Sequence, residues 1–159
     1  MYIIIGLIVL GLIGLDQITK VWATAALSGG RDIPIWNGVF HLQYVKNTGA
    51  AFGMLGGKQV FLIVITTLII IGMLVYYRKL PKTFWGNWSK VSFVLIISGA
   101  IGNLIDRVFL NYVRDFLYFK LINFPVFNVA DILVVVGVCL LVIAMIFGEL
   151  EEERKKEKA

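Results

Sequence analysis

The sequence predicts an integral membrane protein, mainly α-helical, with four transmembrane helices, a small extracytoplasmic β-sheet that forms a cradle, and an aromatic-rich outer loop. Hydrophobic residues make up 59% of the 159 positions and charged residues only 16%, against roughly 25% charged residues in soluble domains. Long apolar runs separate the charges, and acidic residues are rare before the C-terminus. At this length we expect one membrane-embedded domain, 1–159.

Four uncharged stretches predict the helices, at 1–15, 59–77, 91–105 and 132–148. A 15-residue stretch is roughly 22 Å long as a helix, short of a hydrocarbon core of about 30 Å. Two helices must therefore continue past their first charge. We expect helices at about 2–26, 59–77, 90–109 and 128–148, and a polar cytoplasmic tail at 149–159. The first extension places Asp16 and Lys20 one helical turn apart, where acid and base can pair.

Basic residues predict the orientation of the chain. The short connection between the second and third helices carries Arg78, Lys79, Lys82 and Lys90 and no acid, which is typical of a cytoplasmic loop. Both termini are then cytoplasmic. The regions at about 31–57 and 111–127 are expected on the outer side.

The outer region at about 31–57 contains a β-strand pattern. Phe40, Leu42 and Tyr44 alternate with His41 and Gln43, as in a half-buried strand. This pattern predicts a small sheet on the membrane surface. We expect His41, the only histidine, to be a strand residue, because a metal site would need further nitrogen or sulfur ligands.

Carboxylates are so scarce that each one is a functional candidate. Five aspartates are the only acids in the first 148 positions, and all five glutamates lie in the last eleven. An ionised carboxylate among apolar residues costs about 3 kcal/mol unless it is paired, hydrated or functional. The composition therefore indicates an activity carried by aspartates. The five are Asp16, Asp32, Asp106, Asp115 and Asp131.

Two amide–carboxylate pairs lie at the ends of apolar helices. Asn103 and Asp106 share a face at the end of the third predicted helix, next to Arg107, and Asn128 and Asp131 have the same spacing at the start of the fourth. The small residues at 98–102 are explained by close helix packing alone. Packing does not explain these polar groups.

Asp115 and Asp131 flank a short aromatic-rich stretch and can face each other across a cleft. Two carboxylates about 3 Å apart cannot both ionise easily, so the pair offers both a general base and a general acid, as in an aspartic protease. The residues alone leave ion transport or structural pairing open. The alternative function is a small ion- or proton-coupled transporter that uses intramembrane aspartates.

Five motifs follow one another along the chain: DQITK at 16–20, NTGAAF at 47–52, GNLIDR at 102–107, VRDF at 113–116 and FNVAD at 127–131. In this order they resemble the motifs of the lipoprotein signal peptidase (signal peptidase II) family of bacterial membrane aspartic peptidases. Together they extend over nearly the whole chain, and their order together with four membrane segments makes the resemblance specific.

The resemblance implies an intramembrane or interfacial aspartic endopeptidase that removes signal peptides from diacylglyceryl-modified prolipoproteins, cleaving before the lipidated cysteine. It implies that Asp115 and Asp131 are the catalytic dyad. Residues that bind substrate or shape the site are, by the same resemblance, Asn47, Asn103, Arg107, Asn128 and Ala130. Structural polar support is implied for Asp16, Lys20 and Asp106.

The expected location is the bacterial cytoplasmic membrane, crossed several times, with the active site toward the extracytoplasmic side. We expect the lipid-modified substrate and membrane phospholipid as partners, no nucleic acid, no metal or cofactor, and a monomer. One position departs from the family, in which the residue before Asp115 is commonly aliphatic. Here it is Arg114, a cation that could lower the pKa of the dyad or simply turn toward lipid headgroups, so the sequence leaves its effect open.

Overall fold

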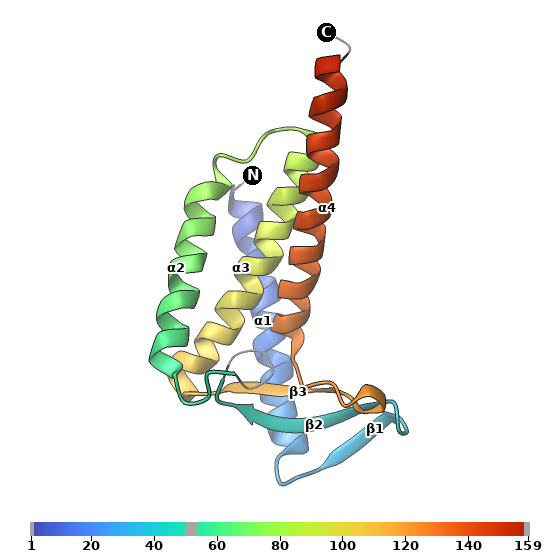
Figure 1. Ribbon diagram of the computed structural model, residues 1–159. Coiled ribbons are helices and arrows are strands. Elements are labelled where there is room, and N and C mark those ends of the chain that lie inside the picture. Colours follow the sequence, from blue (N-terminus) through green and yellow to red (C-terminus); the bar gives the residue numbers. More distant parts are fainter. Residues whose placement is uncertain (1, 50–53, 158–159) are drawn as a thin grey trace.

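Four long helices lie side by side in the computed structural model, which describes residues 2–49 and 54–157 (Figure 1). Positions 50–53, which include the last three residues of the second motif, lie outside the described residues. Each helix is long and apolar enough to cross a membrane, which confirms the predicted four-helix class. The helices are α1 (Tyr2–Leu27), α2 (Gln59–Tyr77), α3 (Phe84–Leu110) and α4 (Val129–Glu157).

Two predicted helix ends are wrong, because α3 begins earlier than we expected and α4 ends later. α3 begins at Phe84 and not at 90, since the Thr83 hydroxyl accepts a hydrogen bond from the Gly86 amide at 3.0 Å and caps the helix. α4 continues to Glu157 and not to 148. Glu151 and Lys155 pair one turn apart at 2.6 Å, which suits a helix in water. The predicted tail is thus helical through Glu157.

α3 is the central helix and packs against each of the other three. Small residues permit this close packing, as predicted. A Cβ on Gly99 would overlap the carbonyl of Ala130, and one on Gly102 would lie 2.5 Å from a carboxylate oxygen of Asp16. The polar residues of α3 are therefore pressed directly against α1 and the start of α4.

A three-stranded antiparallel sheet lies across one end of the bundle, and both chain termini lie at the other end (Figure 1). The strands are β1 (Asp32–Trp36), β2 (Phe40–Asn47) and β3 (Val113–Phe119), in that spatial order. β2 confirms the strand predicted from alternation. Ala23 and Leu27 of α1 pack with Phe116 of β3, which fixes the sheet to the bundle.

We did not predict the third strand, β3, and expected Asp115 to lie in the outer loop. Asp115 is instead paired with Val45 of β2. β3 does not alternate regularly between apolar and polar residues, since Asp115 and Phe116 are both buried. Its strand conformation depends on pairing with β2, which the local sequence does not show.

The rest of the outer segment is compact and aromatic. A 3₁₀-helix, η2 (Lys120–Ile122), follows β3, and Phe127 pairs back to Leu117 before α4 begins. The rings of Phe119 and Phe127 stack at 5.6 Å, and Phe124 meets Phe127 edge-on at 5.8 Å. This folding back places the start of α4 beside β3.

Candidate active site

Asp115 points from β3 into the protein, and its side chain is held by two amides. The residue is only 1% exposed. Asn47 Nδ2 donates to one carboxylate oxygen at 2.9 Å, and Asn128 Nδ2 donates to the other at 2.6 Å. One donor comes from β2 and the other from the residue that precedes α4, so the fold of the outer segment determines the position of Asp115.

Asp131 lies in the first turn of α4 and forms a capping box with Asn128. The amide of Asn128 donates to Asp131 Oδ2 at 3.0 Å, and the amide of Asp131 donates to Asn128 Oδ1 at 3.0 Å. These reciprocal bonds satisfy backbone donors at the helix start. They explain locally why the motif at 127–131 begins a helix. The other oxygen of Asp131 accepts from Asn103 Nδ2 at 2.8 Å.

Lys20 determines which way the Asn103 amide points. The Lys20 ammonium is only a donor, so the atom of Asn103 that it reaches at 2.9 Å must be the carbonyl oxygen. That oxygen also accepts from Asn128 Nδ2 at 3.1 Å. The Asn103 amide nitrogen is then directed at Asp131. A chain of hydrogen bonds thus runs from α1 through α3 to both aspartates.

A group of charged side chains on α1 and α3 supports this chain of hydrogen bonds. Lys20 pairs with Asp16 at 2.9 Å and lies 3.6 Å from Asp106, and all three side chains are fully buried. Asp16 also accepts the backbone amide of Ala130 at 3.0 Å. The predicted pairing of Asp16 with Lys20 is confirmed. It is one part of a larger group that joins α1, α3 and α4.

The Arg114 side chain does not turn outward, as one of the two alternatives had it. Its guanidinium binds Asp106, with the shortest N–O distance 2.7 Å. It also donates to Gln17 Oε1 at 2.8 Å. Burial leaves its side chain 11% exposed, which excludes a headgroup contact. The carboxylate of Asp106 raises the pKa of Arg114, so the cation is held there.

Arg107 extends from α3 toward the motif at 47–52. Its guanidinium donates to the carbonyl of Gly49 at 3.1 Å, and within the described residues its Nε has no partner. The Gly49 amide in turn donates to Asn47 Oδ1 at 2.9 Å. Arg107 therefore braces the turn that carries Asn47, the amide donor of Asp115.

The protonation of Asp115 is shifted by its surroundings. Burial is the larger cause and the nearby charge of Asp131 the second, and together they raise the pKa of Asp115 from 3.8 to about 7. The hydrogen bonds from Asn47 and Asn128 oppose this change in the pKa. A carboxyl group with such a pKa can both hold and release a proton near neutral pH.

Each of the four oxygens of Asp115 and Asp131 accepts one hydrogen bond from an amide. Each oxygen keeps a further lone pair for water, substrate or a shared proton. In the part of the chain that is described, no group of three or more His, Cys, Asp or Glu side chains could hold a metal ion. The arrangement therefore suits acid–base activation of water by two carboxyl groups.

Four apolar helices and two hydrogen-bonded aspartates suit a membrane-embedded peptidase. The family model of signal peptidase (SPase) II matches residues 8–147, and this family is of the aspartic peptidase type. The chain therefore belongs to the signal peptidase II family.

Relatives and solved structures agree with this assignment. A lipoprotein signal peptidase of Clostridium tetani is 47% identical over 152 residues, which cover 94% of this chain and 96% of that protein. One from Clostridioides difficile is 46% identical over 144 residues, which cover 90% and 95%. A solved bacterial membrane enzyme is 31% identical in sequence, with a TM-score of 0.82. The match covers 89% of this chain and 87% of that enzyme's chain.

The structure brings nearly all the predicted residues into one connected network, and it adds Gln17, which the sequence did not single out. Gln17 donates to Asp16 and Asp106 and accepts from Arg114. A polar amide inside an apolar helix was the available signal for Gln17. The role of Arg114 had no sequence signal, because its partner lies on another element.

Proposed function

We propose that this chain removes signal peptides from prolipoproteins that carry a diacylglyceryl group, and that it cleaves before the lipidated cysteine. Support comes from membership of the signal peptidase II family and from relatives named lipoprotein signal peptidase. The single observation that carries the chemical proposal is that Asn128 binds both Asp115 and Asp131. Because the family match is to a peptidase, the transporter alternative is not retained.

In the proposed reaction, Asp115 and Asp131 are the catalytic dyad and share one proton. The ionised carboxylate takes a proton from water, and the water oxygen attacks the carbonyl carbon of the scissile peptide bond. The protonated carboxyl group gives its proton to the developing oxyanion. Collapse of the tetrahedral intermediate then breaks the C–N bond. The carboxyl group that took the proton from water gives it to the leaving amine, and the other carboxylate takes back a proton from the hydroxyl of the intermediate. The raised pKa of Asp115 favours the singly protonated pair near neutral pH.

The other polar residues are proposed to orient this pair. Asn128 and Asn103 hold the carboxylates from α4 and α3, and Asn47 holds Asp115 from the sheet. Arg107 braces the turn before the undescribed positions 50–53 and shapes the site from that side. Support from outside the dyad is proposed for Asp16, Lys20, Asp106 and Ala130.

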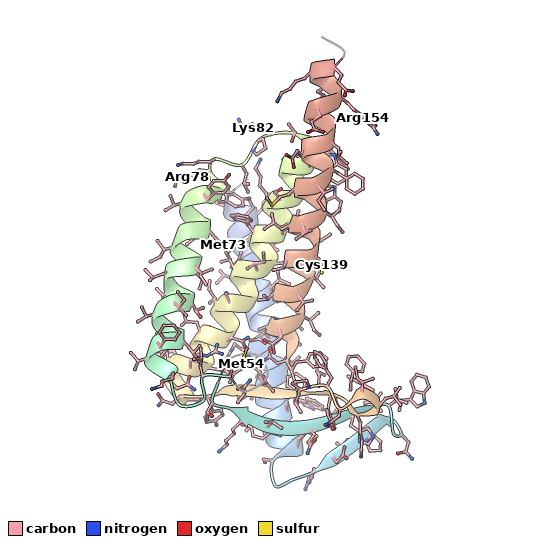
Figure 2. The ribbon with its side chains drawn as sticks, in the orientation of Figure 1. Met54, Met73, Arg78, Lys82, Cys139 and Arg154 are labelled. Carbon is pink, nitrogen blue, oxygen red and sulfur yellow. The ribbon has the colours of Figure 1, made fainter. Side chains whose placement is uncertain are left out.

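We infer that the sheet and the dyad lie on the extracytoplasmic side of the bacterial cytoplasmic membrane and that both termini are cytoplasmic. Figure 2 shows Arg78, Lys82 and Arg154 at the end of the molecule away from the sheet, and basic residues collect on the cytoplasmic side of membrane proteins. A substrate anchored by its acyl chains would reach the dyad at the depth of the outer interface. We propose that the chain works as a monomer among phospholipids, without metal or cofactor.

Cleavage of a purified prolipoprotein tests the proposal. The enzyme should cleave the diacylglyceryl-modified precursor and cleave the unmodified precursor at least about a hundredfold more slowly, because loss of the anchor misplaces the scissile bond. Asp115→Asn and Asp131→Asn should each abolish cleavage. The matched control is Glu151→Gln, which also replaces a carboxylate by an amide but lies in an exposed pair far from the site, and it should not abolish cleavage. Equal cleavage of both precursors would contradict lipid-directed positioning. Turnover by either folded Asn variant would remove that aspartate from the dyad.

A further inference from the structure

Arg114 and Asp106 are joined by three hydrogen bonds next to the site. The backbone amide of Arg114 donates to Asp106 Oδ2 at 2.9 Å, and Nε donates to the same oxygen at 3.1 Å. The guanidinium Nη2 donates to Asp106 Oδ1 at 2.7 Å. The planar guanidinium of Arg114 therefore binds both carboxylate oxygens of Asp106, a two-pronged contact that we call the fork. The backbone amide of Arg114 binds Asp106 as well, so both the main chain and the side chain of Arg114 are held.

This contact lies one residue from Asp115. Moving the main chain at Arg114 must move the Cα of Asp115, because consecutive Cα atoms are about 3.8 Å apart and rigidly linked. On α3, Asp106 lies one turn after Asn103, which binds Asp131. α3 thus holds Asp131 through Asn103 and the chain beside Asp115 through Asp106.

The fork is rigid because it is buried and braced. Asp106 is fully buried, and the Arg114 side chain is 11% exposed. Gln17 connects the two, since its Oε1 accepts from Arg114 at 2.8 Å and its Nε2 lies 3.4 Å from Asp106. With Asp16 and Lys20, the group has two positive and two negative side chains, so its formal charges balance.

We propose that Arg114 is a positioning residue, which clamps β3 to α3 through Asp106 and thereby sets the place of Asp115 relative to Asp131. The inference rests on the proposed dyad. Arg114 itself does not touch the reacting atoms, because its guanidinium is used by Asp106 and Gln17. Displacement of a catalytic group by about 1 Å can lower a rate roughly a hundredfold, so loss of the clamp should act on kcat and leave KM unchanged.

Steady-state cleavage of the lipid-modified precursor by Arg114→Met, compared with wild type at equal amounts of folded enzyme, tests this role. We expect kcat to fall by between about tenfold and a hundredfold, with KM within about twofold. The matched control is Arg154→Met, an exposed arginine at the far end of α4 (Figure 2). Wild-type kcat in folded Arg114→Met, or a rise in KM alone, would overturn the proposal.

Arg114→Lys keeps the charge but cannot form the fork, so it serves if Arg114→Met does not fold. Its kcat should be reduced, but less than in Arg114→Met, with KM unchanged. A wild-type kcat in Arg114→Lys would overturn the fork as the positioning element.

A double-mutant cycle tests the route through Asp106. If Arg114 acts only through Asp106, then Asp106→Asn together with Arg114→Met should lower kcat no further than the worse single variant. If the effects of the two single changes on kcat multiply in the double variant, the proposed route through Asp106 is overturned. Asp115→Asn, assayed in parallel, separates this question from the dyad itself. If Asp115→Asn is active, the proposed dyad fails. If Asp115→Asn is inactive and Arg114→Met has the wild-type kcat, only the positioning role fails.

Discussion

The carboxylate of Asp16 accepts the backbone amide of Ala130 at 3.0 Å, so the first helix caps the first turn of the last helix. The positive end of the α4 dipole faces this carboxylate. The other oxygen of Asp16 pairs with Lys20. One buried side chain therefore joins α1 to the turn that carries Asp131.

Asp16→Ala should destabilise the protein strongly, because it leaves both Lys20 and the Ala130 amide without this acceptor. Loss of one partner from a buried ion pair costs about 3 kcal/mol or more. The exposed pair of Glu151 with Lys155 gives the control, since Glu151→Ala should cost below about 1 kcal/mol. Thermal unfolding in detergent measures both. At equal amounts of folded enzyme, Asp16→Ala should keep more activity than Asp115→Asn, and equal inactivity would contradict its supporting role.

Two changes at Asn128 should separate helix capping from site chemistry. Asn128→Asp keeps an oxygen that can accept from the Asp131 amide, but it has no amide to donate to Asp115 and adds a third carboxylate. This variant should fold and be inactive. Asn128→Ala should be inactive and also less stable by about 1 kcal/mol, because the cap is lost. Helix content, melting temperature and cleavage are measured together, and an active Asn128→Asp would show that donation to Asp115 is dispensable.

The raised pKa of Asp115 predicts how activity changes with pH. Above about pH 7, Asp115 loses its proton, and the proposed dyad loses the acid that Asp115 supplies. Once the pH is well above this pKa, kcat should fall by roughly tenfold per pH unit. A pH profile of kcat with the lipid-modified precursor checks this expectation. A kcat that is constant up to pH 9 would show that no such proton is needed.

The same pKa predicts a cost in stability. Between pH 3.8 and about 7 the folded protein binds a proton at Asp115 that the unfolded chain does not bind. Stability from this group therefore falls as pH rises through that window, by on the order of 1 kcal/mol per pH unit. Asp115→Asn removes this cost, so its melting temperature should be higher than that of wild type at pH 8. The difference in melting temperature should be smaller at pH 4. An equal difference at both pH values would contradict the shifted pKa.

A methyl group at Gly102 should disturb the support of the site. Its Cβ would lie 2.5 Å from Asp16 Oδ2 and 3.3 Å from the Ala130 side chain. We expect Gly102→Ala to cost about 1–3 kcal/mol through overpacking. Gly72→Ala on α2 meets nothing within 4 Å and should be neutral or slightly stabilising. Melting temperatures of the two variants test the difference, and equal values would show that Asp16 can move aside.

The sequence alone determined the four membrane helices, because hydropathy is a local property and a long apolar run has few alternatives to a membrane helix. It also showed which residues are polar inside apolar surroundings, and these include Asp16, Lys20 and Asn103. Burial in lipid makes such groups costly, so their presence alone marked them as functional candidates.

The tertiary structure alone decided how these residues are connected. Lys20 reaches Asn103 across 83 positions of the chain, and Asn47 reaches Asp115 across 68. No local pattern predicts β3 or the turn of Arg114 toward Asp106, since both depend on partners from distant segments. A hydrogen bond needs its two atoms within about 3 Å. Only the packing of α1, α3 and the sheet brings those atoms together.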